Sequence, residues 1–329
     1  MAKFLTKRIL LSILILFFVM FIIYVLMYSL PSSYIENTAR NLSQKPGTQK
    51  SAAQWIAELN AQYGMDKGVI GGFMTWMKFA VRGEFGESWY WTTAVTAKFN
   101  DVIWYSFTLA FVAFILEIVI AVPLGVIAAR KQYSGVDYTV TVIALIGISL
   151  PTFFVATILK MIFAVKLGWL DISGMQGRYF LQLSSWGKFI DLAKHFIMPA
   201  LTLVIISIGS LMRYTRTNML EVLNADYIRT ARAKGLPEKR VISYHAFRNT
   251  LIPLITILGA SLPTLFGGAL ITETLFSITG IGFTSYTSMI NGDIPFTMFY
   301  LAFSSVLVLV GNLIADILYA VADPRVRVN

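Results

Sequence analysis

The stretch ADYIRTARAKGLPEKR, residues 225–240, places five basic side chains between two long apolar segments. Apolar residues recur at spacings of three and four from just before this stretch into it: Leu220, Leu223, Tyr227 and Ala231. This spacing predicts an amphipathic helix over the first part of the stretch. Gly235 suits the left-handed position that ends a helix, and Pro237 suits the first turn of the next one. We therefore expect a helix, a turn, and a second helix over about residues 237–247.

The composition on either side of this stretch is that of a membrane protein. Of 329 residues, 57% are hydrophobic and only 13% are charged, which a soluble globule could not shield from water. A helix needs about 20 apolar residues to cross the hydrocarbon core of a bilayer. Six stretches approach or exceed that length: Ile9–Leu30, Val102–Ala129, Tyr138–Val165, Phe196–Met212, Leu251–Ile278 and Phe296–Val321. We expect an all-α polytopic membrane protein with six transmembrane helices.

The positions of the basic residues predict the topology. They cluster as Lys3, Lys7 and Arg8 before the first span, Arg130 and Lys131 after the second, eight residues from Arg213 to Arg248, and Arg325 and Arg327 at the end. The loop between the last two spans has no Lys or Arg. Because cytoplasmic loops are enriched in these residues, both termini and the loop 213–249 are predicted to be cytoplasmic. The net charge of +10 is thereby explained without a nucleic-acid partner.

Three regions follow from this topology. Residues 1–30 form the cytoplasmic N-terminus and first transmembrane helix, 31–101 an extracytoplasmic segment, and 102–329 a core with five transmembrane helices. The external segment contains SAAQWIAELNAQYG, residues 51–64, in which Ser51 and Gln54 form a capping-box pair and Gly64 stands where a helix ends. A small external helical lid is predicted.

The sequence carries no pattern for catalysis or metal binding. It has no cysteine and only two histidines, so thiol chemistry and Cys-ligated metals are excluded. The motifs of phosphate-binding loops, zinc proteases and serine hydrolases are all missing. We expect a non-catalytic chain with no catalytic residues, no metal and no cofactor of its own.

Ionisable residues within the apolar spans are candidates for function. They are Glu117, Lys160, Glu273 and Asp316. A charge at the centre of a membrane helix costs about 2.5–3.5 kcal/mol, so each needs a partner or water. We expect structural roles for Lys160, snorkelling to the outer interface, and for Asp316. Glu117 and Glu273 are candidate pathway residues, and Glu273 with Gly280 and Gly282 in the following SITGIGF segment is a candidate external gate.

The cytoplasmic loop has two interpretations. Small residues line one side of its turn: Thr230, Ala231, Ala233 and Gly235. They would let another protein's backbone approach closely, while the surrounding arginines bind carboxylates. Alternatively the loop lies on anionic lipid headgroups, which its charge alone would favour. Charge does not explain the small residues.

The segments DYIRTARAKGL and HAFRNTLIPL together resemble the cytoplasmic signature of ATP-binding-cassette importer permeases, particularly the B-type oligopeptide/dipeptide branch. Four further segments are similar to that branch: YGMDKGVIGGFMTWMKFAVRGEFGESW, IAVPLGVIAAR, ITETLFSITGIG and DILYAVADPRVR. Two positions depart from the family pattern. Arg229 stands where many relatives have Glu, and Thr279-Gly280 replaces a common Pro-Gly.

The resemblance implies that the loop is a coupling helix seated in a groove of an ATPase subunit. The implied contacts are Tyr227, Ile228, Arg229, Thr230, Ala231, Arg232, Ala233, Lys234 and Gly235. It also implies a second permease chain of C type, two ATPase subunits that bind ATP and Mg, and an extracytoplasmic solute-binding protein. The expected function is import of di- or oligopeptides by alternating access, in a bacterial or archaeal cytoplasmic (inner) membrane.

Other functions stay open at this point. A proton-coupled secondary transporter would use Glu117 or Glu273 as a relay, but leaves the loop unexplained. A scaffold without transport would explain the loop but not the charges inside the spans. Within the importer interpretation, nickel chelates, glutathione and oligosaccharides are alternative substrates.

Overall fold

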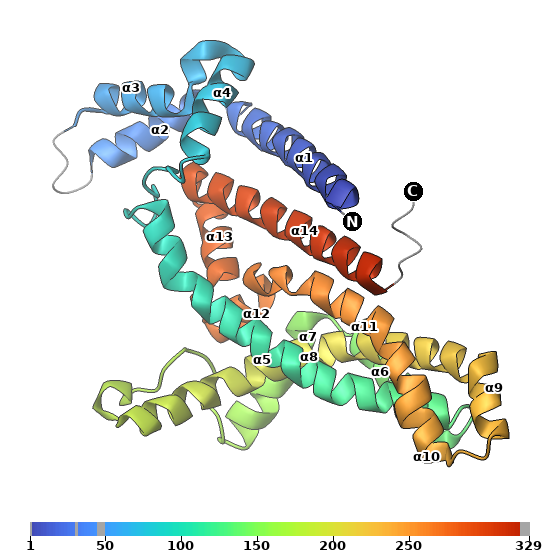
Figure 1. The fold of residues 1–329 in the computed structure, drawn as a ribbon. Coiled ribbons are helices and arrows are strands. Elements are labelled where there is room, and N and C mark those ends of the chain that lie inside the picture. Colours follow the sequence, from blue (N-terminus) through green and yellow to red (C-terminus); the bar gives the residue numbers. More distant parts are fainter. Residues whose placement is uncertain (1, 30–31, 45–49, 323–329) are drawn as a thin grey trace. The chain divides into compact units, whose positions relative to one another are not determined.

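The computed structural model describes residues 2–29, 32–44 and 50–322, and these residues are organised as helices (Figure 1). The α-helices are α1 (Ala2–Tyr28), α2 (Ser32–Ser43), α3 (Ala52–Tyr63), α4 (Gly68–Ala80), α5 (Val95–Arg130), α6 (Gly135–Ser149), α7 (Thr152–Leu159), α8 (Ser185–Leu223), α9 (Asp226–Ala233), α10 (Glu238–Arg240), α11 (Phe247–Ser261), α12 (Leu270–Phe276), α13 (Ile281–Ile290) and α14 (Ile294–Ala322). Short 3₁₀ or π segments are η1 (Met65–Lys67), η2 (Lys160–Lys166), η3 (Phe180–Gln182), η4 (Val241–Ala246) and η5 (Pro263–Phe266). In the described residues β pairing is limited to an isolated bridge between Glu87 and Ala94. The predicted all-α class is confirmed for this part of the chain.

Five helices in the described part are long and apolar enough to cross a membrane. They are Thr6–Tyr28, Val95–Arg130, Ser185–Leu223, Glu238–Phe266 and Ile294–Leu318. Each overlaps one of the predicted spans. Their length and apolar character show a multi-pass membrane protein.

The third predicted span, residues 138–165, is not one straight helix. Two helical pieces, Gly135–Ser149 and Thr152–Lys166, meet there at an angle of 104°. Leu150 between them has an extended backbone, with φ −82° and ψ 130°. Pro151 explains the break, because its ring disfavours helical geometry at the preceding residue. With this bent pair counted as one span, the chain has up to six.

The fifth predicted span, residues 251–278, begins earlier and ends earlier than expected. It starts at Glu238, and its last turn is the 3₁₀ segment η5, after which the chain turns into the separate helix α12. Gly268 lies in that turn with φ +80°, and a Cβ added there would come within 2.8 Å of the Gly282 Cα. The turn therefore needs glycine both for its dihedral angle and for a close backbone contact.

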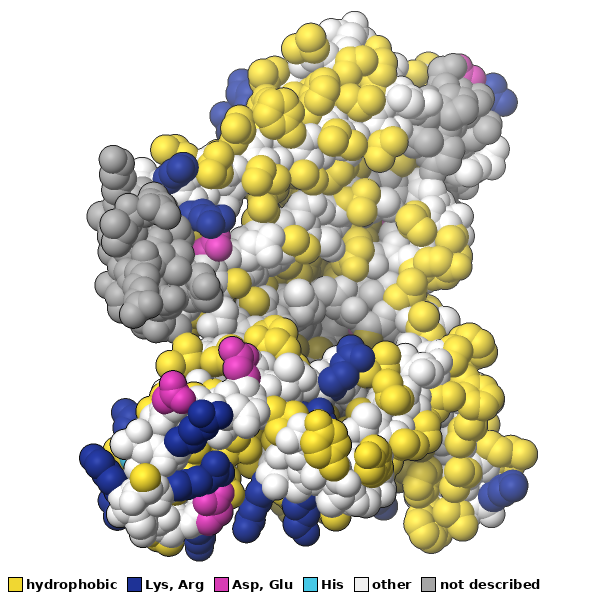
Figure 2. Space-filling model, turned by 90° about the vertical axis from the view of Figure 1, so that its right-hand side faces the viewer, with side chains coloured by type: hydrophobic (Ala, Val, Ile, Leu, Met, Phe, Trp, Pro, Cys, Tyr) yellow, Lys and Arg dark blue, Asp and Glu magenta, His cyan; other side chains and the backbone are white. Residues whose placement is uncertain are grey.

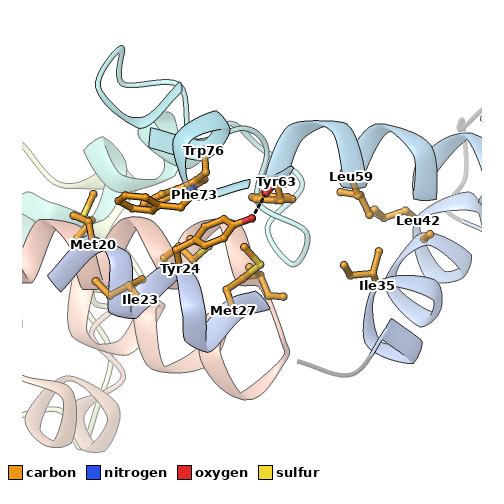
Figure 3. Close-up of a cluster of buried hydrophobic side chains, with 14 residues drawn as sticks. Met20, Ile23, Tyr24, Met27, Ile35, Leu42, Leu59, Tyr63, Phe73 and Trp76 are labelled. Carbon is orange, nitrogen blue, oxygen red and sulfur yellow. Dashed lines mark hydrogen bonds between the residues drawn. The ribbon is translucent and has the colours of Figure 1, made fainter. Parts of the chain in front are cut away.

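The structure divides into two compact units, described separately here. One unit comprises Ala2–Val102 and Thr284–Leu309. Its aromatic cluster contains Tyr24, Phe73 and Trp76, and the buried Tyr24 hydroxyl donates a hydrogen bond of 2.7 Å to the Tyr63 carbonyl (Figure 3). Burial also raises the pKa of the Tyr63 phenol above its ordinary value. This core fastens α3 and α4 to α1.

The helix predicted within residues 51–64 is confirmed at both ends, while its external position stays a prediction. The Ser51 hydroxyl accepts from the Gln54 N–H, and the Gln54 side chain accepts from the Ser51 N–H, which is the capping box. Gly64 ends the helix in the left-handed conformation, φ +63°. The neighbouring α2 and α4 were not predicted.

The other unit comprises Ile103–Phe283 and, at the end of the described chain, residues 310–322. Within it α6 packs closely on α8. A Cβ added to Gly147 would approach the Ile205 carbonyl oxygen to 2.5 Å, and one added to Gly209 would meet the Ala144 carbonyl. Small residues at such crossings let two helix backbones approach closely, as is usual in membrane bundles.

The basic residues Arg325 and Arg327, which the topology prediction used, lie outside the described residues.

Candidate functional site

The loop that was predicted to be cytoplasmic, residues 213–249, is built as predicted from a helix, a turn and a second helix. The chain leaves α8 after Leu223, and α9 follows as a separate helix of eight residues. Gly235 in the turn has φ +76°, and Pro237 is the N-cap of α10. The second helix does not stop near residue 247, because α10 continues through η4 into α11.

The buried face of α9 differs from the predicted one. Ile228 and Ala231 are 0% and 6% exposed and pack in a cluster with Met219 and Val241. Tyr227, predicted on the apolar face, is 47% exposed. Ala231 is therefore small because α9 lies against α8 and η4, and it is not available to a partner.

A basic surface remains exposed on α9 and its turn. Of the residues assigned to coupling, those exposed are Tyr227, Arg229, Thr230, Arg232, Ala233, Lys234 and Gly235. Figure 2 faces the side of the molecule that carries α9 and α10, and Lys and Arg side chains gather in its lower part. We call these seven residues the α9 surface.

One ion pair spans the turn. The Arg232 guanidinium donates to both carboxylate oxygens of Glu238, at 3.2 and 2.9 Å. These hydrogen bonds raise the pKa of Arg232, and burial followed by the charge of Glu221 raises that of Tyr227. The pair holds the last turn of α9 against α10, while Arg229 makes only a long contact of 3.4 Å to Asp226.

The candidate gate residue Glu273 is completely buried, with 0% exposure. Its Oε1 accepts from the Ser106 hydroxyl at 2.6 Å and from the Ala269 N–H at 2.9 Å, and its Oε2 accepts from the Phe283 N–H at 2.8 Å. The Ser106 Oγ also accepts from the Ile281 N–H at 2.7 Å. The carboxylate thus ties the start of α12, at Ala269, and the first turn of α13, at Phe283, to Ser106 of α5.

The two glycines assigned to the gate lie against this carboxylate. A Cβ on Gly280 would lie 2.7 Å from the Glu273 Cδ, and one on Gly282 would lie 3.0 Å from its Oε2. Both contacts are closer than van der Waals packing allows. The three residues form one tight bracket, and their role as a gate stays a prediction.

Lys160, for which a structural role at the outer interface was predicted, has a hydrogen-bond partner in the structure. Its Nζ donates at 2.7 Å to the carbonyl of Leu275, in the last turn of α12. Cations stabilise the free carbonyls at a helix C-terminus. Lys160 therefore caps α12.

Glu117 lies in the wall of a cavity of about 800 Å³. The wall is formed by α5, α8, α11 and the turn that follows, and Arg213 is the other charged residue in it. The Ser207 hydroxyl donates to the Val204 carbonyl at 3.4 Å, and the Ser207 side chain also interacts with the Glu117 carboxylate. Of the predicted pathway residues, Glu117 faces a cavity and Glu273 does not. In the described part of the chain no cluster of three or more His, Asp or Glu side chains could hold a metal ion.

Comparisons with known proteins cover the whole chain. Residues 121–328 match the family described as binding-protein-dependent transport system inner membrane component, and residues 1–93 match the N-terminal region of such components. The chain belongs to this family. It is 36% identical to the oligopeptide transport system permease protein AppB of Bacillus subtilis over 99% of this chain and 100% of that protein.

Two further relatives of the permease are of similar identity. The di/tripeptide transport system permease protein DppB of Pseudomonas aeruginosa is 35% identical over 85% of this chain and 88% of its own length. The dipeptide transport system permease protein DppB of Escherichia coli is 34% identical over 82% and 85%. The family assignment made from the loop segments is confirmed.

Sequence reasoning missed several residues of this permease. Ser106 was not identified, because its partner Glu273 is 167 positions away. Arg213 was counted only as a topology signal. A readable signal did exist on α8, where the polar residues Ser207, Ser210, Tyr214 and Thr217 recur at helical spacing.

Proposed function

We propose that this permease is the membrane-spanning subunit of an ATP-driven, binding-protein-dependent importer of di- and oligopeptides. Family membership implies a multi-subunit importer with partner components. The three relatives described above are named as oligopeptide, di/tripeptide and dipeptide permeases, which supports a peptide substrate.

In this proposal the chain crosses a bacterial or archaeal inner membrane six times, with both termini inside. The bent pair α6–α7 counts as one crossing, and the segment 31–101 lies outside. The eight basic residues between Arg213 and Arg248 support a cytoplasmic position for the α9 surface.

The proposed partners supply what this chain lacks. Two ATPase subunits bind ATP and Mg, a C-type permease forms the second half of the pathway, and an external protein delivers the peptide. When ATP brings the ATPases together, α9 moves with them, and the bundle changes from inward-facing to outward-facing. Such alternating access is driven by the different stabilities of two states.

The observation that carries the proposal is the construction of α9. A short helix set apart from α8 and α10 is anchored by Ile228 and Ala231, yet leaves its basic side exposed. An anchored helix with exposed arginines can transmit force to a protein groove rich in carboxylates. A loop that only lies on lipid headgroups needs no such anchoring.

Co-purification with the ATPase subunits tests the proposal. Ala233 is exposed at the end of α9, and Ala57 is exposed on the external helix α3. We expect Ala233→Trp to release the ATPases and abolish ATP-dependent peptide uptake, whereas the matched Ala57→Trp leaves them bound. Equal retention by both variants would contradict the proposed role of α9. Uptake that persists without ATP in proton-energised vesicles would support the secondary transporter instead.

A further inference from the structure

The cavity beside Glu117 has a polar stripe along one of its walls. The residues of α8 that face it include Ser207, Ser210, Tyr214 and Thr217, together with Arg213. Residues three and four apart lie on the same side of a helix, so these side chains follow one line along α8. The opposite walls are mainly apolar, for example Phe114 and Leu258.

Two opposite charges face this cavity without neutralising each other. Glu117 and Ser207 both line the cavity, and the two side chains interact. In the described part of the chain, no carboxylate lies within ion-pair distance of Arg213. An acidic side chain without a cationic partner inside an apolar span is costly, and such residues usually mark a substrate pathway. Glu117 is such a residue, whereas the Arg213 side chain is exposed. By contrast, Asp137 on α6 and Arg216 on α8 form a direct ion pair, with 2.6 Å between the Arg216 Nε and the Asp137 Oδ1.

The spacing of the two charges can be estimated along α8. Glu117 meets α8 at Ser207, and Arg213 follows six positions later. At a rise of 1.5 Å per residue this is about 9 Å along the helix axis. An extended peptide spans about 3.3–3.6 Å per residue, so two or three residues cover roughly 7–10 Å. A di- or tripeptide therefore has its terminal charges at the separation that the cavity offers.

We propose that this cavity is a transit site for zwitterionic di- and tripeptides. Glu117 binds the peptide's ammonium group, and Arg213 binds its terminal carboxylate. Along α8, Ser210 lies between Ser207 and Arg213, and Thr217 lies beyond Arg213. The hydroxyls of Ser210 and Thr217 hydrogen-bond to the peptide amide groups. The apolar walls accept varied side chains of the peptide. This inference rests on the proposed peptide transport and names the residues that hold the substrate on its way.

The absence of cysteine makes the site testable by labelling. Ser210→Cys places a single thiol in the cavity, and Ser243→Cys places one on the exposed part of η4 as the control. Both are labelled with a maleimide in the detergent-purified complex, where both membrane faces are accessible and no binding protein is needed. The probes are trialanine at millimolar concentration, its N-acetyl form and its C-terminal amide.

We expect trialanine to slow labelling of Ser210→Cys at least threefold and to leave Ser243→Cys unchanged. The acetylated and amidated forms should protect less. In the Glu117→Gln variant, trialanine and its acetylated form should protect the Ser210→Cys thiol from labelling equally. In the Arg213→Gln variant, trialanine and its amide should protect it equally. The blocked peptides remove the ammonium or the carboxylate charge of the peptide while Glu117 and Arg213 stay intact. The inference can therefore be tested even if Glu117→Gln or Arg213→Gln destabilises the chain.

Equal protection by trialanine and both blocked forms, or no protection at all, would overturn the inference. ATPase co-purification and ATP-dependent uptake by the complex of the unmodified, cysteine-free chain separate this failure from failure of the proposed function. If both persist without charge-dependent protection, the transit site alone is wrong. If neither is found in the cysteine-free chain, the proposed function is wrong as well.

Discussion

Ala231 shows how a single small residue can be interpreted in two ways. In the sequence it stands among Thr230, Ala233 and Gly235, and close approach of a partner is a reasonable expectation. In the structure it is 6% exposed and packs with residues of α8 and η4, whereas Ala233 is exposed. Burial decides between the two. The spacing of apolar residues correctly placed Ala231 on the apolar face of the helix, but it placed Tyr227 there as well, where the structure buries Ile228.

A leucine at these two positions distinguishes the interpretations. Overpacking a closely packed site costs about 1–3 kcal/mol, so Ala231→Leu should destabilise the loop and speed its cleavage by protease in the isolated chain. Ala233→Leu should leave the cleavage rate unchanged, because its side chain faces solvent. Faster cleavage of the Ala233 variant would contradict the buried face described for α9.

Gly280 offers a second test at the residue scale. A Cβ there would lie 2.7 Å from the Glu273 Cδ, whereas one at Gly135 meets nothing within 4 Å. We expect Gly280→Ala to lower the free energy of unfolding by about 1–3 kcal/mol, measured by thermal unfolding in detergent. Gly135→Ala, which adds the same methyl group without a clash, should not lower it. If both variants unfold at the temperature of the unmodified chain, the bracket around Glu273 is looser than described.

At the scale of elements, α6 is held to α8 by close backbone contact and by one ion pair. The Arg216 Nε and Nη2 donate to the two oxygens of Asp137 at 2.6 and 2.8 Å, and the Asp137 side chain is 3% exposed. The Tyr133 N–H adds a third donor to this carboxylate at 3.0 Å. The pair fixes the start of α6 against α8 next to the chain turn after α5.

Breaking this pair from either side should be costly. Removing one partner of a buried pair leaves the other charge uncompensated, which costs about 3–5 kcal/mol. Asp137→Asn and Arg216→Gln should each lower the free energy of denaturant unfolding by an amount in this range, and the double variant by little more than either. The exposed pair Arg232–Glu238 is the control, since its loss should cost less than about 1 kcal/mol. Additive losses at Asp137 and Arg216 would show that the two do not act as a pair.

Elements whose signals are local could be predicted from the sequence, and those set by distant contacts could not. The helix after Ser51 was predicted because its capping box and Gly64 lie within 14 residues. The end of the fifth span was not, because the turn at Gly268 depends on Gly282 approaching it. The same holds for Glu273, whose charge was recognised but whose partner Ser106 comes from α5.

At the scale of the whole molecule, α8 connects the features on which the function depends. Its 39 residues extend about 58 Å at 1.5 Å per residue, well beyond a hydrocarbon core of about 30 Å. It carries the polar stripe of the cavity, the pairing residue Arg216, and Met219, on which α9 is anchored. We therefore expect a movement imposed on α9 to be transmitted to the cavity wall through one continuous helix.

The most direct test asks what covers the α9 surface in a working importer. Thr230 is exposed in the middle of α9, and in a chain without cysteine Thr230→Cys supplies a single thiol. In the assembled complex, during ATP-driven peptide uptake, we expect this thiol to be shielded from a bulky maleimide and to cross-link to an ATPase subunit through a short bifunctional reagent. A thiol that stays freely reactive in a fully active complex, with no cross-link to the ATPase, would contradict the account.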